Sequence, residues 1–206
     1  MSYIPEPLLE EIENLKDSGK FDEAIRKVNV LLAKNPSNED ALLQIADIEY
    51  RRGEIQKADK AVDFLNAMKK DDPLGLYIKG ILEMEKNNRK EAREYLKKAL
   101  DLTHGGNHEI IRCYGLCEYR YGNREKGMDY LKNAFEMNNR DAEVIYNIIQ
   151  LEMLERSYIK AKEMINYFYE VHDQLIVVDK TLDWYDKKIA LFEKLLKTQH
   201  LFTSNK

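Results

Sequence analysis

Hydrophobic residues recur at helical spacing along most of the chain, and this pattern repeats itself every 34 or 35 residues. The repetition is visible in four segments: ADIEYRRGEIQKADKAV (46–62), GILEMEKNNRKEAREYL (80–96), GLCEYRYGNREKGMDYL (115–131) and IQLEMLERSYIKAKEMI (149–165). Each segment reads as the end of one apolar-periodic helix, a turn, and the start of a second helix. A period in this range indicates stacked two-helix units. We therefore predict an all-α chain of about five helical hairpins at 5–38, 39–72, 73–106, 107–141 and 142–175.

The register of the hairpins is set by two series of residues. The turn series is Gly19, Gly53, Asn87, Gly122 and Arg156, and the series five residues later is Ala24, Ala58, Ala92, Gly127 and Ala161. Small side chains at the second series allow the two helices of a hairpin to cross closely. The period lengthens by one residue at THGGNHE (103–109), where the two glycines form either an ordinary turn or a hinge.

This layout resembles the tetratricopeptide repeat (TPR) family, over about 170 residues. The resemblance is carried by Gly19, Phe21, Ala24 and Pro36 in the first repeat, by Gly80, Ala92, Ala99 and Leu100 in the third, and by Gly115, Gly122 and Ala134 in the fourth. The fifth repeat matches least well, because Ile149 and Arg156 replace the usual small residue and glycine. The resemblance implies a right-handed superhelical solenoid.

The residues after the fifth hairpin predict a C-terminal capping helix at 176–199, followed by a tail at 200–206. One apolar stripe consists of Val178, Leu182, Tyr185, Ile189, Phe192 and Leu196, and a second of Val177, Trp184, Leu191 and Leu195. The last hairpin of a solenoid leaves apolar surface to be covered, which explains the first stripe. The second stripe either covers the other helix of that hairpin or forms a homodimer contact through Trp184.

Composition narrows the class of partner. The net charge is -4 and the isoelectric point is near 5.7, which disfavours binding to a nucleic-acid backbone. The sequence shows neither a signal peptide nor an apolar stretch of membrane-spanning length, so we expect a cytoplasmic protein without membrane contact. Cys113 and Cys117, four residues apart on one helix, are expected to be reduced.

Residues that could carry catalysis or bind a metal are explained more simply by the fold. Glu49, Glu83, Glu118 and Glu152 recur with the period, so we expect exposed or salt-bridged side chains rather than one active-site acid. His104, His108, Cys113 and Cys117 fall within fourteen residues, but they lack the paired spacing of zinc sites. We therefore expect no catalytic residue, no metal site and no cofactor.

The TPR resemblance implies a concave groove, lined by the first helices, that binds a peptide or a helix of another protein. The positions it assigns to this groove are Leu43, Tyr50, Arg51, Tyr77, Met84, Arg112, Leu116, Tyr119, Arg120, Tyr146 and Met153. Tyrosine and arginine are frequent interface anchors, and mixed aromatic and cationic anchors suit a segment with apolar and acidic residues. The basic residues that clamp chaperone tails in some TPR proteins are missing. A non-catalytic adaptor is thus the main hypothesis, and a structural protein that self-assembles through its terminal helix is the alternative.

Overall fold

The computed structural model describes residues 4–177 and 180–203, and the side chains up to residue 198. Within these ranges the regular elements are helices, as predicted. They are α1 (Glu6–Asp17), α2 (Phe21–Lys34), α3 (Glu39–Arg51), α4 (Ile55–Met68), α5 (Pro73–Glu85), α6 (Arg89–Leu102), α7 (His108–Tyr121), α8 (Arg124–Met137), α9 (Ala142–Leu154), α10 (Tyr158–Glu170), the short 3-10 helix η1 (His172–Gln174) and α11 (Leu182–Thr203). None of these helices is both long and apolar enough to cross a membrane.

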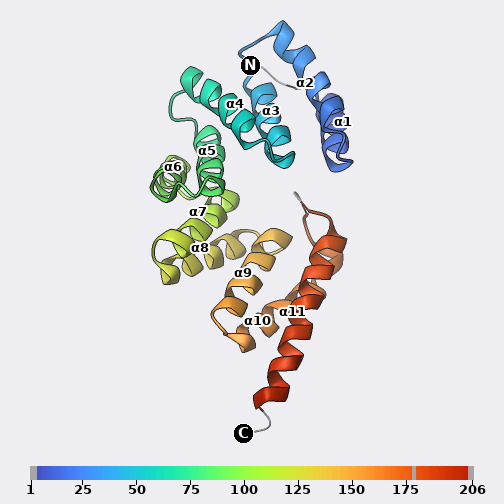
Figure 1. Cartoon of the computed structure of the whole chain (residues 1–206), viewed down its shortest axis with the longest axis vertical. Helices are drawn as coiled ribbons and strands as arrows, with labels where there is room; N and C mark the ends of the chain where they lie inside the picture. Colours follow the sequence, from blue (N-terminus) through green and yellow to red (C-terminus); the bar gives the residue numbers. More distant parts are fainter. Residues whose placement is uncertain (1–3, 178–179, 204–206) are drawn as a thin grey trace. The chain divides into compact units, whose positions relative to one another are not determined.

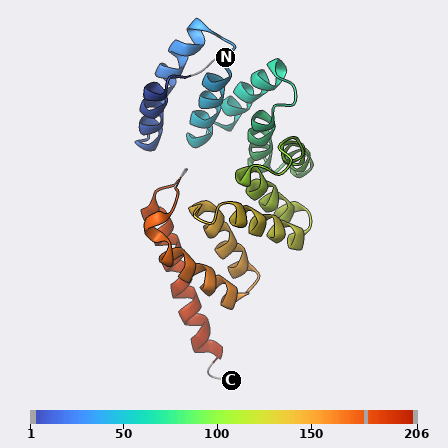
Figure 2. The ribbon, with the colours of Figure 1, turned by 180° about the vertical axis from the view of Figure 1, so that it is seen from behind.

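The chain forms two compact units, residues 1–105 and 106–206. In the first unit, α1 pairs with α2, α3 with α4 and α5 with α6, and each second helix also packs against the next first helix (Figure 1). In the second unit, α7 pairs with α8 and α9 with α10, while α11 lies against both α9 and α10 (Figure 2). Sequence-adjacent helices are therefore neighbours in space within each unit.

Most hairpins turn at the residue that the register predicts. Gly19 (φ 69°), Gly53 (φ 82°), Asn87 (φ 59°) and Arg156 (φ 59°) adopt the left-handed conformation that ends a helix. At Gly53, for example, the backbone N–H bonds to Tyr50 O (2.9 Å) and the next N–H, of Glu54, to Glu49 O (2.8 Å). Gly122 is the exception, with φ -125°, so the fourth hairpin turns differently.

The helices of each hairpin cross at the small residues. Ala24, Ala58, Ala92 and Ala161 have no exposed surface, and Gly127 is buried. The crossing of α7 and α8 is the closest fit, because a Cβ added to Gly127 would lie only 2.5 Å from the backbone nitrogen of Tyr119. The predicted register therefore places the correct residues at the helix contacts.

The C-terminal helix begins later than predicted. α11 starts at Leu182 rather than at residue 176, because Ile176 instead pairs in extended conformation with the loop before α9. The Ile176 N–H bonds to Arg140 O (2.7 Å), and the N–H of Ala142 bonds to Ile176 O (3.0 Å). Val178, assigned to the first apolar stripe, lies outside the described residues.

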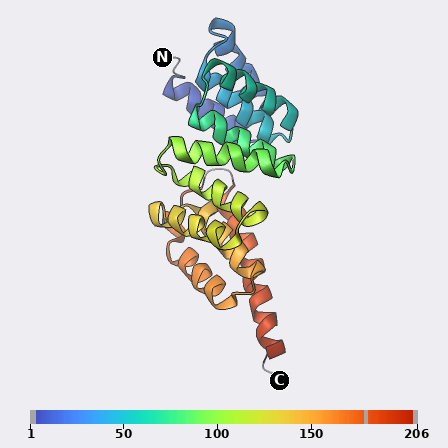
Figure 3. The ribbon, with the colours of Figure 1, turned by 90° about the vertical axis from the view of Figure 1, so that its left-hand side faces the viewer.

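The rest of the first stripe closes the core of the second unit. Tyr185 and Ile189 are fully buried and Leu196 is 6% exposed, in one cluster with Ile149 of α9 and Phe168 of α10. α11 therefore covers the apolar surface of the last hairpin, as expected for a cap. Its C-terminal end continues beyond the ends of α9 and α10 (Figure 3).

Candidate protein-binding surface

In the first unit, the residues assigned to a binding groove lie on α3 and α5 and are partly exposed. Leu43, Tyr50 and Arg51 on α3, and Tyr77 and Met84 on α5, are all of intermediate burial. A half-buried aromatic or methionine side chain is held by its neighbours and still offers apolar surface to a partner. These five side chains of α3 and α5 are thus partly accessible.

A buried lysine joins α1 to α3 beside this surface. The side chain of Lys16 is only 2% exposed, and its Nζ lies 2.6 Å from Glu13 Oε1, 2.6 Å from Asp47 Oδ2 and 3.0 Å from Gln44 Oε1. Arg51 extends the network, with its Nε 3.2 Å from an Asp47 carboxylate oxygen. Because a buried charge that loses its partner is costly, this network holds α1 and α3 in register.

In the second unit, three of the assigned residues have little exposed surface. Arg112, Leu116 and Tyr119 on α7 are 6%, 8% and 8% exposed. The guanidinium group of Arg112 donates to both carboxylate oxygens of Glu109 and lies 3.7 Å from Glu143 Oε1 on α9. The charge of Arg112 is therefore compensated inside the unit.

Tyr119 connects the end of α7 to the end of α9. Its hydroxyl donates a hydrogen bond to Glu155, and the guanidinium group of Arg124 lies 5.5 Å from its ring centroid. Burial, together with the negative charge of Glu155, raises the pKa of Tyr119 to about 12. Tyr119 is thus a neutral donor within the fold, and its removal would perturb stability as well as any binding.

The remaining assigned residues of the second unit are accessible. Arg120 is exposed, and Tyr146 and Met153 on α9 are of intermediate burial. The Tyr146 ring packs edge-on against Trp184 of α11, with ring centroids 5.2 Å apart. Lys188 lies 5.4 Å from the centroid of the Trp184 ring, so part of the proposed dimer contact is already covered by the chain itself.

The four repeated glutamates are buried rather than exposed, and Glu83 forms the ion pair that was the other expected arrangement. Glu49, Glu83, Glu118 and Glu152 are 8%, 6%, 4% and 5% exposed. The Glu83 carboxylate accepts hydrogen bonds from Lys86 (2.9 Å) and from the Asn88 amide in the following turn (2.5 Å). Burial opposes its ionisation, but these donors hold the pKa of Glu83 below its usual value. The Glu83 carboxylate thus binds the turn that follows α5 instead of facing solvent.

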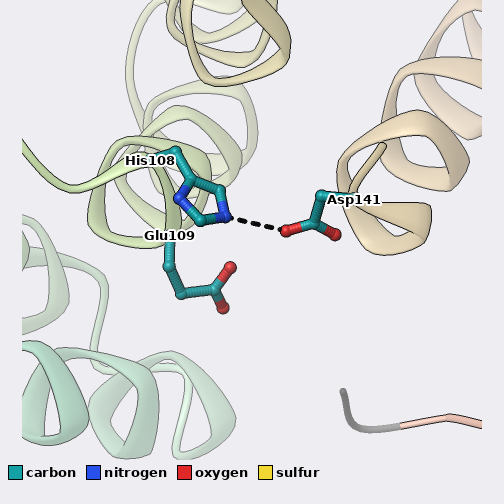
Figure 4. A group of neighbouring side chains, drawn as sticks. All are labelled: His108, Glu109 and Asp141. Atoms are coloured by element: carbon teal, nitrogen blue, oxygen red, sulfur yellow. Dashed lines mark hydrogen bonds and ion pairs between the residues drawn. The ribbon is translucent and has the colours of Figure 1, made fainter. Parts of the chain in front are cut away.

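One group of potential metal ligands occurs in the described residues, where α7 and α9 begin. One ligand atom each from His108, Glu109 and Asp141 lies within 4.8 Å of the others. His108 and Asp141 point toward each other, Nε2 to Oδ2 3.0 Å, and the Glu109 carboxylate lies to one side of this pair (Figure 4). Asp141 Oδ1 also accepts from the Val144 N–H (3.2 Å) and so caps α9. The His108–Asp141 contact joins α7 to α9, and Glu109 binds Arg112 within α7, so all three residues have partners in the fold.

Comparison with known proteins identifies the fold. A family model described as the TT21 fifth ARM repeats domain matches residues 15–112. The structure is similar to that of TTC0263, a thermophilic TPR protein of Thermus thermophilus, with a TM-score of 0.74 and 19% identity over 90% of this chain and 97% of the other. It is also similar to PilW, a type IV pilus biogenesis factor, with a TM-score of 0.70 and 19% identity over 93% and 90% of the two chains. Pseudomonas aeruginosa PilF gives a TM-score of 0.67 and 17% identity over 97% and 96%. No curated protein matches the sequence.

The chain has the TPR fold. In this TPR register, the position three residues before the turn residue is occupied by Lys16, Tyr50, Met84, Tyr119 and Met153. The side chain is buried in α1 and α7 but half-buried in α3, α5 and α9. Side chains at the same TPR position can therefore differ in exposure, because the side chains that surround them on neighbouring helices differ from repeat to repeat.

Lys16 has a clear structural role that the sequence reasoning missed. Its place in the TPR register is that of a candidate interface residue, yet it is surrounded by acceptors from α1 and α3. The signal was present in the sequence, because Glu13 precedes it by one helical turn and Gln44 and Asp47 face it from the next first helix.

Proposed function

We propose that this TPR protein is a non-catalytic scaffold that binds a peptide or a helix of another protein on the first helices of its hairpins. The observation that carries the proposal is the set of partly exposed apolar and aromatic residues on α3 and α5, above all Leu43, Tyr50, Tyr77 and Met84. Tyrosine is among the residues that most often carry the binding free energy at protein interfaces, and methionine adapts its shape to a partner. Arg120, Tyr146 and Met153 extend the proposal to the second unit.

Two groups of titratable side chains in the described chain support a non-catalytic role. Glu83 binds the turn of its own hairpin, and the His108–Asp141 pair joins α7 to α9. Each of these groups is engaged in holding helices and turns together, whereas a general acid or base acts on a group that the substrate brings. The proposed activity is therefore recognition rather than catalysis.

Affinity capture from the source cells tests the proposal with a double variant, Tyr50→Ala with Tyr77→Ala. The matched control is Phe64→Ala with Tyr95→Ala, which removes two aromatic side chains from the second helices of the same two hairpins. Each interface anchor is worth about 1–2 kcal/mol, so the first variant should lose about 2–4 kcal/mol of binding free energy. The control should keep the partner, and both should keep a native circular dichroism spectrum.

The opposite pattern would contradict the proposal. If the Phe64 and Tyr95 variant lost the partner while the Tyr50 and Tyr77 variant retained it, the second helices would form the binding surface.

A further inference from the structure

The last helix has an exposed apolar side that its own unit does not cover. Tyr185, Ile189 and Leu196 face the core of the unit, whereas Leu191 and Leu195 are 51% and 44% exposed. On a helix, positions 184, 191 and 195 fall on one side, so Trp184 belongs to the same stripe. The cap therefore has a second apolar side.

This stripe is continuous with the accessible side of α9. The ring of Trp184 contacts that of Tyr146, and helical spacing places Met153 and Leu154 on the same side of α9 as Tyr146. Leu154 is 67% exposed. In the other four hairpins the corresponding position holds a charged residue: Asp17, Arg51, Glu85 and Arg120. The hairpin beside α11 is thus the one that presents a leucine there.

The charges around the stripe are predominantly positive. Lys188 and Lys194 are exposed on α11, and helical spacing places one on each side of the stripe. The acidic groups of the same helix are engaged: Asp183 pairs with Lys187 (2.5 Å), Asp186 with His172 (2.9 Å), and Glu193 lies against Tyr169. An apolar stripe bordered by lysines is complementary to apolar residues flanked by carboxylates.

We propose that the exposed sides of α9 and α11 bind an acidic amphipathic segment of a partner protein. The inference rests on the proposed function and adds the chemistry of the ligand. A second copy of the chain fits less well, because a two-fold contact through α11 would bring like-charged lysines together. A membrane surface fits less well too, since the Trp184 ring is held against Tyr146 and Lys188. Among the side chains of α11 that the structure describes, Leu191 and Leu195 would remain to insert.

Synthetic peptides test this inference directly by fluorescence anisotropy. The probe is a labelled peptide of about 18 residues, or five helical turns, with leucine at helical spacing and glutamate at the other positions. One control has the same composition in scrambled order, and another has lysine in place of glutamate. The acidic amphipathic peptide should bind at least about tenfold more tightly than either control.

Variants locate the site. Leu191→Ser with Leu195→Ser, and Lys188→Glu with Lys194→Glu, should each weaken binding of the peptide about tenfold or more. The matched control, Lys160→Glu with Lys162→Glu, reverses two exposed charges on α10 and should leave the affinity unchanged. Since all six side chains are exposed, the variants should keep the native circular dichroism spectrum.

Several results would overturn the inference. Equal affinity for the amphipathic and scrambled peptides would do so, as would unchanged binding by both α11 variants. Binding to phosphatidylserine vesicles without binding to the peptide would assign α11 to a membrane. A concentration-dependent dimer that is lost in the serine variant would assign it to self-association.

The outcome also separates this inference from the proposed function. If the captured partner is lost on Tyr50→Ala with Tyr77→Ala but retained by both α11 variants, the scaffold function stands and the α11 site fails. If the peptide binds at α11 but no partner depends on Tyr50 and Tyr77, the α11 site stands and the surface on α3 and α5 fails.

Discussion

Gly127 offers the sharpest test of the packing, because sequence and structure make opposite predictions for Gly127→Ala. The other four hairpins have alanine at this position. Alanine is also favoured over glycine inside a helix by about 1 kcal/mol, so the sequence alone predicts stabilisation. In the structure, a Cβ at this position would lie 2.5 Å from Tyr119 N and 2.7 Å from Gly115 O, both backbone atoms that cannot rotate away.

The magnitude follows from these distances. Ordinary contacts begin near 3.4 Å, so α7 and α8 must separate by roughly 0.7–0.9 Å at the crossing. Overpacking of this kind costs about 1–3 kcal/mol, and the helix propensity of alanine offsets about 1 kcal/mol of that. We therefore expect a net destabilisation of up to about 2 kcal/mol.

Urea unfolding followed by tryptophan fluorescence measures this cost. The chain has one tryptophan, Trp184, which lies in the same unit as Gly127. Gly75→Ala is the matched control, because the three atoms nearest to the added Cβ belong to the side chains of Asn66 and Leu65, which can move. The control, followed by circular dichroism, should change stability by no more than about 0.5 kcal/mol. A stabilised Gly127→Ala variant would refute the close crossing of α7 and α8.

Three further predictions concern buried and partly buried polar groups. Glu83→Gln removes a buried charge that Lys86 and Asn88 stabilise, so thermal unfolding should show a loss of about 1–3 kcal/mol. An unchanged midpoint would contradict a stabilising role for this buried charge. One buried carboxylate oxygen of Glu49 lacks a hydrogen-bond partner among the described residues, whereas Glu83 accepts a hydrogen bond from the amide of Asn88 five residues later. Glu54→Asn places an amide at the matching position and should stabilise the protein by about 0.5–1 kcal/mol in urea unfolding. Destabilisation would contradict this prediction. The hydrogen bond to Asp186 raises the pKa of His172 above its usual value of 6.5. The ion pair between His172 and Asp186 therefore gives its full stabilisation below pH 6.5, and this stabilisation is lost as the pH rises through the raised pKa of His172. The second unit should lose about 0.2–1 kcal/mol between pH 6 and pH 8.5, and Asp186→Asn should abolish this difference.

The periodic part of the fold could be predicted because its physical causes are local. Gly53 and Asn87 end helices through their own backbone conformation, and Ala92 permits a close crossing because it is small. Such requirements repeat in every hairpin and are visible in one sequence. The start of α11 could not be predicted in the same way, since it depends on Ile176 pairing with the loop before α9.

The candidate surface was predictable only in part, for a related reason. The register locates Tyr50 and Tyr119 at the same place in their helices, but Tyr119 is buried and bonded to Glu155 in another hairpin. The burial of Glu83 likewise depends on donors in the following turn. Exposure is thus set by contacts between segments, which periodicity does not encode.

Hydrogen–deuterium exchange of the chain with its captured partner would show which helices the partner covers. We predict that the partner slows exchange in the first helices α3, α5 and α9, and in α11 if the bound segment is acidic and amphipathic. The second helices α4, α6, α8 and α10 should exchange at unchanged rates. Slower exchange confined to these second helices would contradict the proposed function, because the partner would then bind the opposite side of the hairpins.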